Sequence, residues 1–495
     1  MKAIKYWGLL FILGIFTGCE SLEDTYSDYT EGGAQRYLGK CQDLSVEPGW
    51  KRLIVNWKNH VDPVIDKIKV SWTLDGVEQD TLLEKGTTSC NITGLENGTY
   101  EIAVRSVDKE GNMSLPVLGY VRPYTSEHEN VMSFTRLVSK HFFVKNRLAL
   151  VFDEWSDNIE TATLCYYSGE KRDSLIIDSE FIEKNPYLLL DKPIDPNSPV
   201  TIERSGYLKG CTDLIVFEPY ELTRHRMYTP DFKELMRVKY GVTEVTEDFV
   251  STLETLEVDY DIFTLEDILN MPALKTLYLG KNRYLHSKQA SDFSNYSTLN
   301  DEELSAFAME VAAEVNGLKV ERYNKHYFWW DEFDFMEEKG NPQLPELSYL
   351  KADKWKYSYA GESKDEEELI PRLFDEASQN GWQSRKVNES SKHEIIVDMQ
   401  EMKLINGVVI SQQLANNSNM YYIAQKIQIK TSIDGETWTD ATHVVENKLG
   451  ATKGETTILN FSSPKNAQYV KFILTDQQNS NGSSFAVSLQ KIKFF

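Results

Sequence analysis

Short runs in which apolar and polar residues alternate fill the first quarter of the chain. Four such runs occupy residues 51–57, 66–74, 88–95 and 98–108. Turn-forming residues such as Asp75-Gly76 separate them. Alternation with a period of two is typical of half-buried strands, and short strands joined by turns predict a small β-sandwich, here at 41–124.

The same pattern recurs further along the chain at a constant offset. Arg52 and Leu53 are matched by Arg147 and Leu148, and the aromatic residues that follow also correspond. A second sandwich at 125–222 is the simplest explanation, and two unrelated β segments with one amphipathic pattern are the alternative. The stretch GLENGTYEIAVRSVDKEGNMS in the first copy resembles the late strands of a fibronectin type III module, so we expect tandem immunoglobulin- or fibronectin III-like sandwiches.

From about residue 225 the pattern changes to mixed helix and strand. LETLEV (253–258) recurs as LKTLYL (274–279), and this spacing resembles a leucine-rich repeat. A helix with one apolar face is predicted after residue 300 and ends at Asn316-Gly317, before a further strand at 318–323. Two clear repeats are too few for a solenoid, so we expect a compact, leucine-rich-repeat-like α/β domain at 223–348.

Alternation returns in the last third of the chain. IQIKTSIDGETW contains Asp434-Gly435 between alternating residues, which is a strong hairpin signal. We expect Trp438 to pack in or beside the core and the hairpin to be scaffold. The ordered set from Phe374-Asp375 through Gly381-Trp382, IIVD and this hairpin to the terminal strand resembles the discoidin family, also called coagulation factor type C. Its sugar-binding members are the family 32 carbohydrate-binding modules.

The discoidin resemblance implies a jelly-roll at 349–495 that binds ligands with loops at one end. Two amide-rich loops, 411–425 and 475–485, supply the planar donors, acceptors and aromatic faces that sugars need. The alternative is that these residues only favour turns. The candidate glycan-binding residues are Gln412, Gln413, Asn416, Asn417, Asn419, Tyr421, Tyr422, Asn479, Asn481 and Phe485.

The same resemblance raises the question of a structural calcium ion. Family members often bind Ca²⁺ with an Asp in the first loop and a Glu in the last strand. Asp375 matches the first position, but Lys491 stands at the second, and an ammonium cannot ligate a cation. We therefore expect no cofactor and no metal.

The N-terminus has the features of an exported, lipid-anchored protein. Two lysines precede an apolar run that ends at Phe16, which predicts a signal peptide at 1–18. The sequence ending in Cys19 resembles the bacterial lipoprotein box, in which that cysteine is lipidated; an ordinary secretory signal is the alternative. A polar tether at 19–40 begins with an acidic run that resembles an export tag for the outer face of the outer membrane.

Composition narrows the class of partner. At 495 residues the chain is long enough for several domains, and 41% hydrophobic residues indicate a globular protein. A net charge of -23 argues against nucleic acid as a partner. Beyond Cys19, either two disulfides or four free buried thiols are open for the remaining cysteines, Cys41, Cys90, Cys165 and Cys211.

One stretch, YNKHYFWWDEFDFMEE (323–338), has carboxylates beside aromatic residues, as a glycosidase does. Alternating burial in a strand or at a domain boundary explains this stretch as well, and we expect no enzymatic activity.

Taken together, the predicted domains resemble those of surface lipoproteins that work with outer-membrane glycan-uptake systems. In such proteins, spacer domains hold a polysaccharide-binding domain away from the membrane, and outer-membrane transporters are partners. The N-terminal half resembles a family of uncharacterised exported domains. The alternative function is protein–protein adhesion through the middle domain, and Trp329, Trp330, Asp331 or Glu332 would matter only for a second sugar platform or a glycosidase.

Overall fold

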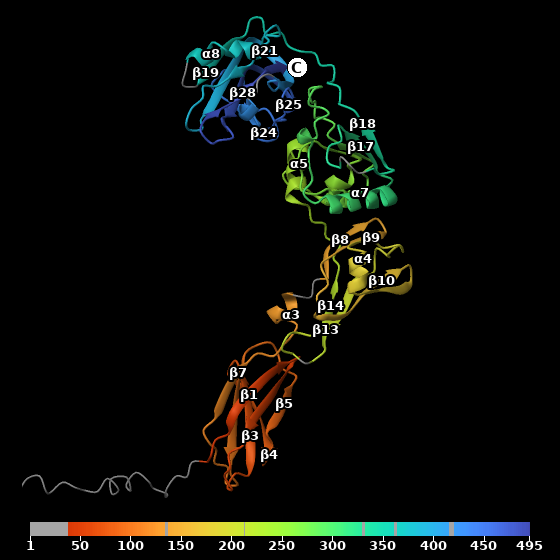
Figure 1. The fold of residues 1–495 in the computed structure, drawn as a ribbon, viewed down its shortest axis with the longest axis vertical. Helices are drawn as coiled ribbons and strands as arrows, with labels where there is room; N and C mark the ends of the chain where they lie inside the picture. The colour runs from red at the N-terminus through yellow and green to blue at the C-terminus, as the bar shows by residue number, and fades with distance from the viewer. Residues whose placement is uncertain (1–37, 134–136, 212, 329–331, 361–363, 415–419) are drawn as a thin grey trace, which may run out of the picture.

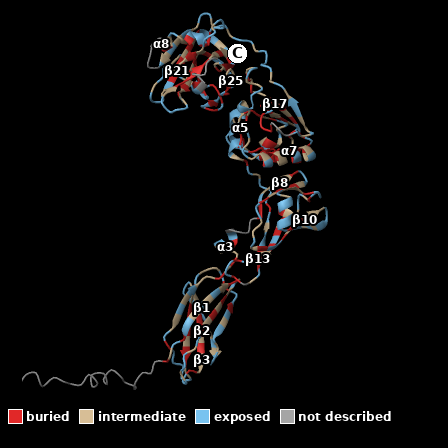
Figure 2. Ribbon diagram, in the orientation of Figure 1, coloured by how far each residue is buried: buried red, intermediate tan, exposed pale blue. Residues whose placement is uncertain are grey.

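Four bodies follow one another along an elongated, curved chain (Figure 1). The computed structural model describes residues 38–133, 137–211, 213–328, 332–360, 364–414 and 420–495. Strands hold 43% of the residues and helices 13%, so the expected mainly β fold class is confirmed. Figure 2 shows buried residues concentrated inside each body, and the core of the third body also includes Phe142, Val144 and Ala149 of the second.

The first body is a sandwich of two antiparallel sheets. Leu53, Val55 and Trp57 alternate with outward-facing residues along β2 and point into the core between the sheets. Because each sheet buries only one face, this alternation is what the period-two pattern predicts. One sheet has the order β1-β2-β5 and the other β4-β3-β6-β7. The strands are β1 Gln42–Gly49, β2 Arg52–Lys58, β3 Lys67–Leu74, β4 Val77–Glu84, β5 Ser89–Thr93, β6 Tyr100–Val107 and β7 Val117–Val121.

The second body repeats the topology of the first strand for strand. Its sheets have the orders β12-β9-β8 and β11-β10-β13-β14, which are the orders of the first body with every strand number raised by seven. Arg147 and Leu148 begin β9 as Arg52 and Leu53 begin β2, so the predicted tandem sandwiches are confirmed. The elements are α3 Glu129–Ser133, β8 Val138–Val144, β9 Arg147–Phe152, β10 Ile159–Ser168, β11 Lys171–Ile177, α4 Ser179–Lys184, β12 Tyr187–Leu189, β13 Thr201–Gly206 and β14 Ile215–Glu221.

The third body has a parallel sheet in the order β15-β16-β17-β18, with α5 and α7 beside it (Figure 1). The two similar segments pair in register, Thr255 beside Thr276, while the leucine-rich-repeat resemblance stays a prediction. Helix α7 ends at Gly317, whose φ of 69° is the left-handed conformation that glycine adopts readily. The elements are α5 Pro230–Tyr240, α6 Glu247–Ser251, β15 Thr255–Val258, η1 Glu266–Asn270, β16 Thr276–Leu279, η2 Phe293–Asn295, α7 Glu302–Asn316, β17 Lys319–Tyr323 and β18 Met336–Lys339.

The last body is built on two strands of twenty residues each, β21 and β25, which pair along most of their length. The predicted hairpin lies between β22 and β23, and Gly435 has a φ of 79° in its turn. Trp438 is half-buried with Lys471 Nζ 4.6 Å from its ring centre, and its expected role as scaffold stays a prediction. The elements are β19 Lys356–Ala360, α8 Lys364–Glu367, η3 Ile370–Leu373, β20 Trp382–Gln383, β21 Lys392–Ser411, η4 Met420–Tyr422, β22 Lys426–Ser432, β23 Thr439–Asp440, β24 Asn447–Lys448, β25 Thr456–Thr475, β26 Gln477–Gln478, β27 Phe485–Ala486, β28 Ser488–Leu489 and β29 Lys491–Phe494.

The expected domain limits at residues 124, 222 and 348 stay predictions, since no measurement defines them. Of the two expectations for the cysteines, the structure shows free thiols. Cys41, Cys165 and Cys211 are buried and Cys90 is half-buried. Burial raises the pKa of each of the four thiols.

A buried ion pair joins the third and fourth bodies. Arg283 Nη2 donates to Glu455 Oε2 over 3.0 Å, and Arg283 Nε also contacts Glu455 Oε1. The side chains of Arg283 and Glu455 are 8% and 1% exposed. Beside the pair, the backbone N–H of Thr456 donates to the carbonyl of Tyr284 over 3.0 Å. The contact is therefore both bidentate and excluded from water.

We expect Arg283→Met to destabilise the fourth body. The substitution leaves Glu455 buried without its counter-charge, which costs about 3 to 5 kcal/mol in the free energy of unfolding. Scanning calorimetry should show a lower unfolding temperature for the transition that contains this body. Arg172→Met is the control, because Arg172 and Glu203 are 59% and 48% exposed and such pairs contribute about 0 to 1 kcal/mol. An Arg283→Met trace that superimposes on the wild-type trace would contradict this account.

Candidate functional site

Three loops of the fourth body meet at one end. Val387 and Phe485 exchange backbone hydrogen bonds of 3.0 and 2.8 Å, which joins the segment 384–391 to the segment 475–487. The Tyr422 hydroxyl lies 2.8 Å from Ser484 Oγ, which adds the end of the 411–425 loop to the same cluster. We call this cluster the loop end.

The predicted residues Gln412 and Gln413 form hydrogen bonds to backbone carbonyls next to the loop end. Gln412 is 2% exposed, and its Nε2 donates to the carbonyls of Ala424 and Gly450. Gln413 Nε2 donates to the carbonyl of Trp382 over 3.2 Å. Side-chain amides used in this way hold backbone segments together, so we assign Gln412 and Gln413 to the scaffold rather than to the ligand surface.

The two predicted tyrosines have different surroundings. Tyr422 is 2% exposed and bonded to Ser484, whereas Tyr421 is 43% exposed. Phe485 is half-buried and pairs through its backbone with Val387 and Gln478. Of the predicted aromatic residues, Tyr421 is therefore the one that offers an open face to a ligand.

The predicted asparagines also divide. Asn479 closes the turn of its own loop, since its Oδ1 accepts from the N–H groups of Ser483 and Ser484. Asn481 is exposed at the tip of the same turn. Asn416, Asn417 and Asn419 lie outside the residues that the structure describes.

Two cationic side chains at the loop end were not among the predicted residues. Arg385 and Lys386 are exposed, and Lys386 Nζ lies 5.2 Å from the centre of the Tyr422 ring. Sequence reasoning selected amide-rich loops and passed over the segment 384–391, because a short basic pair in a turn has no distinctive pattern. Lys386 and Tyr422 are far apart in the sequence, and the fold brings them together.

A buried network of hydrogen bonds joins two of these loop segments, 384–391 and 475–487, where they leave the β-sheet. Asp476, 5% exposed, accepts hydrogen bonds from Ser384 Oγ, from the backbone and hydroxyl of Ser391, and from His393 Nε2 at 2.7 Å. Burial disfavours the charged form of Asp476, but the hydrogen bond and charge of His393 outweigh it and lower the pKa of this carboxyl. Asp476 therefore joins the segment 384–391 to the segment that follows β25.

The network continues on the other side of His393. The Tyr359 hydroxyl lies 2.6 Å from His393 Nδ1 and donates to Glu366 Oε2 over 2.7 Å. Glu366 in turn contacts the backbone N–H of Arg385. Both ends of the network thus fix the 384–391 segment, and the predicted site residues rest on a scaffold that the sequence pattern did not identify.

We expect Asp476→Asn to destabilise the fourth body in a pH-dependent way. The lowered folded pKa means that Asp476 contributes stability above its unfolded pKa of about 3.9, and that this contribution disappears as the pH falls through the folded value. At pH 7 the loss is about 2 kcal/mol, which is usual for hydrogen bonds to a charged group. Thermal unfolding from pH 7 to pH 3 should show the wild type and Asp476→Asn converging at low pH. The surface variant Asp440→Asn is the control, and equal wild-type and Asp476→Asn curves at pH 7 would refute the assignment.

The Lys491 ammonium occupies a cage of backbone carbonyls. Its Nζ donates to the carbonyls of Arg372 and Ser378, each over 3.2 Å, and also contacts the carbonyl of Asp375. The Asp375 carboxylate accepts from the N–H of Ala377 over 2.9 Å. Carbonyl oxygens that converge in this way form a cation site. Here the cation is supplied by the chain itself, and among the described residues no cluster of three or more His, Cys, Asp or Glu is placed to hold a metal.

We expect Lys491→Met to lower the free energy of unfolding by about 2 kcal/mol, because the caged carbonyls lose a charged donor. A chelator should leave the wild-type unfolding temperature unchanged. Lys491→Glu places a carboxylate beside the same carbonyls, so added Ca²⁺ should raise its unfolding temperature. Lys493→Met, which breaks the more exposed pair with Glu376, is the control and should have little effect. A chelator-sensitive wild type would show that the cage holds a metal instead.

In the stretch that resembled a glycosidase site, the structure describes His326, Glu332 and Asp334. His326 is fully buried, its Nδ1 accepts from the N–H of Ser297 over 2.8 Å, and burial lowers its pKa to about 3. Glu332 and Asp334 are exposed. Trp329, Trp330 and Asp331 lie outside the described residues. His326 is thus a core residue of the third body.

Two family models match parts of the chain. Residues 358–489 match the F5/8 type C domain, so the C-terminal domain is a discoidin domain. Residues 19–177 match DUF4998, a domain of unknown function. No curated protein sequence matches the chain.

Solved structures with similarity to the chain include two family 32 modules. The module CpGH89CBM32-5 from Clostridium perfringens, in complex with GalNAc-β-1,3-galactose, is 19% identical; the match covers 30% of this chain and 99% of that one, with a TM-score of 0.25. The family 32 module of C. perfringens NanJ, in complex with galactose, is 15% identical over 30% of this chain and 96% of that one, with a TM-score of 0.24. A two-domain fibronectin type III segment of chicken tenascin is 14% identical over 37% of this chain and 97% of that one, with a TM-score of 0.18.

Proposed function

We propose that the chain is a noncatalytic, lipid-anchored surface protein that captures polysaccharide at the loop end of its discoidin domain. The observation that carries the proposal is that the loops meeting at the loop end each expose a side chain suited to a sugar, namely Tyr421, Lys386 and Asn481, and that hydrogen bonds hold these loops together. Aromatic faces pack against the C–H side of a sugar, and amides and cations bind its hydroxyl groups. A preformed scaffold lowers the entropy that such contacts lose on binding.

The remaining bodies act in this proposal as a spacer. Lipidation at Cys19 would hold the N-terminus at the outer membrane, facing the cell exterior, and the stacked bodies would carry the discoidin domain away from the lipid. Among the described residues, no helix is long and apolar enough to cross a membrane. Single sugar contacts are weak, so several copies on one surface would gain affinity for a long polysaccharide. An outer-membrane glycan transporter is the partner that this arrangement suits.

Titration calorimetry of the full mature chain tests the proposal. The probes are galactose, GalNAc-β-1,3-galactose and a set of plant and host polysaccharides. We expect Tyr421→Ala to weaken binding about tenfold, because one aromatic contact contributes about 1 to 1.5 kcal/mol. Tyr120→Ala is the matched control, since Tyr120 is 62% exposed on the first sandwich, far along the chain from the loop end. Binding that Tyr421→Ala leaves unchanged would refute the site, and no binding across the set would refute the function.

A second candidate function has its own observation. Phe263 and Phe293 of the third body are 55% and 67% exposed, and exposed aromatic residues are enriched at protein interfaces. Under this alternative the third body would bind a partner protein and the discoidin domain would be a structural cap. The calorimetric test separates the two, because Tyr421 has no role in the alternative.

A further inference from the structure

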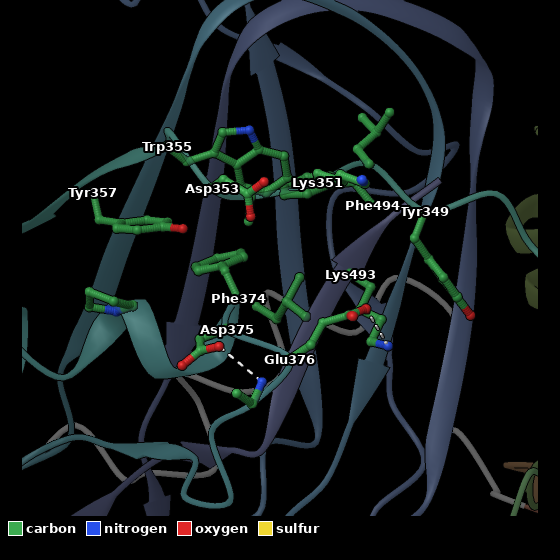
Figure 3. Close-up of a pocket in the computed structure, with 15 residues that line it drawn as sticks. Tyr349, Lys351, Asp353, Trp355, Tyr357, Phe374, Asp375, Glu376, Lys493 and Phe494 are labelled. Atoms are coloured by element: carbon green, nitrogen blue, oxygen red, sulfur yellow. Dashed lines mark hydrogen bonds and ion pairs between the residues drawn. The ribbon is translucent and has the colours of Figure 1, made fainter.

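The discoidin domain has a groove of about 860 Å³ that does not belong to the loop end (Figure 3). Its walls come from three segments: 349–357 before and within β19, 371–377 within and after η3, and 492–494 in β29. None of the loop-end segments contributes a lining residue. The volume lies in the range of ordinary ligand pockets.

Aromatic rings form one wall of the groove. Tyr357 stacks on Phe374 with 4.9 Å between ring centres, and Trp355 meets Phe494 edge-on at 5.0 Å. Phe374 and Phe494 are buried, whereas Trp355 and Tyr357 are half-buried. The buried pair thus fixes the orientation of the two rings that face the groove.

The backbone keeps the groove open without a ligand. The N–H of Leu350 donates to the carbonyl of Phe494 over 3.0 Å, and the N–H of Trp355 donates to the carbonyl of Ala352 over 3.2 Å. These bonds hold the segment 349–355, which precedes β19, against the last strand, β29. A ligand would therefore meet a wall that is already formed, which reduces the entropy lost on binding.

Polar groups that face the groove are of two kinds. Glu376 pairs with Lys493 over 3.0 Å, and Asp375 accepts from Ala377, so these carboxylates are engaged. Asp353 and Lys351 are exposed and have no bonding partner among the described residues. The Tyr357 hydroxyl is protonated at neutral pH and can donate to a ligand, and burial raises its pKa further, to about 12.

The charges that line the groove nearly balance, since Lys351 and Lys493 stand against Asp353, Asp375 and Glu376. A charged ligand would gain little from this balance, whereas a neutral ligand with an apolar face and several hydroxyl groups suits rings beside single donors and acceptors. We propose that the groove is a second binding site of the discoidin domain, and that it takes the pyranose rings of a neutral linear glycan. Trp355 provides the stacking face, and Tyr357 and Asp353 bind hydroxyl groups. This inference goes beyond the proposed function, because it does not use the loop end.

The test uses the full mature chain with cellotetraose, mannotetraose and β-1,4-galactotetraose as probes. Indole N–H resonances report binding, and comparison with Trp355→Phe identifies the Trp355 signal among those of the other tryptophans. We expect at least one probe to shift this signal and to bind about tenfold more weakly to Tyr357→Phe/Asp353→Ala, which removes two hydrogen-bonding groups and keeps both rings. Circular dichroism and thermal unfolding check that the double variant is folded.

Tyr421→Ala is the matched control, and it should leave the Trp355 shift unchanged. Conversely, Tyr357→Phe/Asp353→Ala should leave any binding at the loop end unchanged, so the failure of one site is distinguishable from the failure of the other. The proposal is overturned if no probe shifts the Trp355 signal at about 10 mM, a concentration that reveals even millimolar binding. It is also overturned if a probe binds wild type and double variant equally.

Discussion

The buried pair of Arg283 and Glu455 is the constraint on which the geometry of the C-terminal half depends. Two charges removed from water persist only if each satisfies the other, so the relative position of the third and fourth bodies is fixed to within hydrogen-bond tolerance. Glu455 also accepts the backbone N–H of Gln412 through its own carbonyl, over 2.8 Å. Gln412 follows β21 directly and is the second residue of the 411–425 loop. The third body thereby braces the loop end from outside the discoidin domain.

The other junctions are closed by the same kind of contact. Arg52 donates from Nε to Asp213 over 2.8 Å between the two sandwiches, and Lys140 pairs with Glu266 between the second sandwich and the third body. These pairs are more exposed than the Arg283 pair, so each contributes less. Apolar contacts add to these pairs, as a small cluster at the first junction and as Phe142, Val144 and Ala149 of the second sandwich within the core of the third body.

Sequence patterns predicted the elements better than they predicted the site. Period-two alternation identified the strands of both sandwiches, and the apolar face ending at Gly317 identified α7, because burial on one face leaves a local signature. Whether a polar residue binds a ligand or holds the scaffold leaves no such signature in the local sequence. Tyr421 and Tyr422 are neighbours in the sequence, yet Tyr421 is exposed whereas Tyr422 is buried and contacts Ser484 and Lys386. Asp476 and His393 likewise became scaffold through partners more than eighty residues away.

The free thiols of the two sandwiches have a consequence for what holds their sheets together. Small β-sandwiches in oxidising compartments commonly depend on a disulfide to reach their stable state. Here Leu53, Val55 and their counterparts in the second sandwich fill the cores without one, and burial keeps the cysteines in their unreactive protonated form. Apolar packing, and not a covalent cross-link, therefore holds the two sheets of each sandwich together in the described part of the chain.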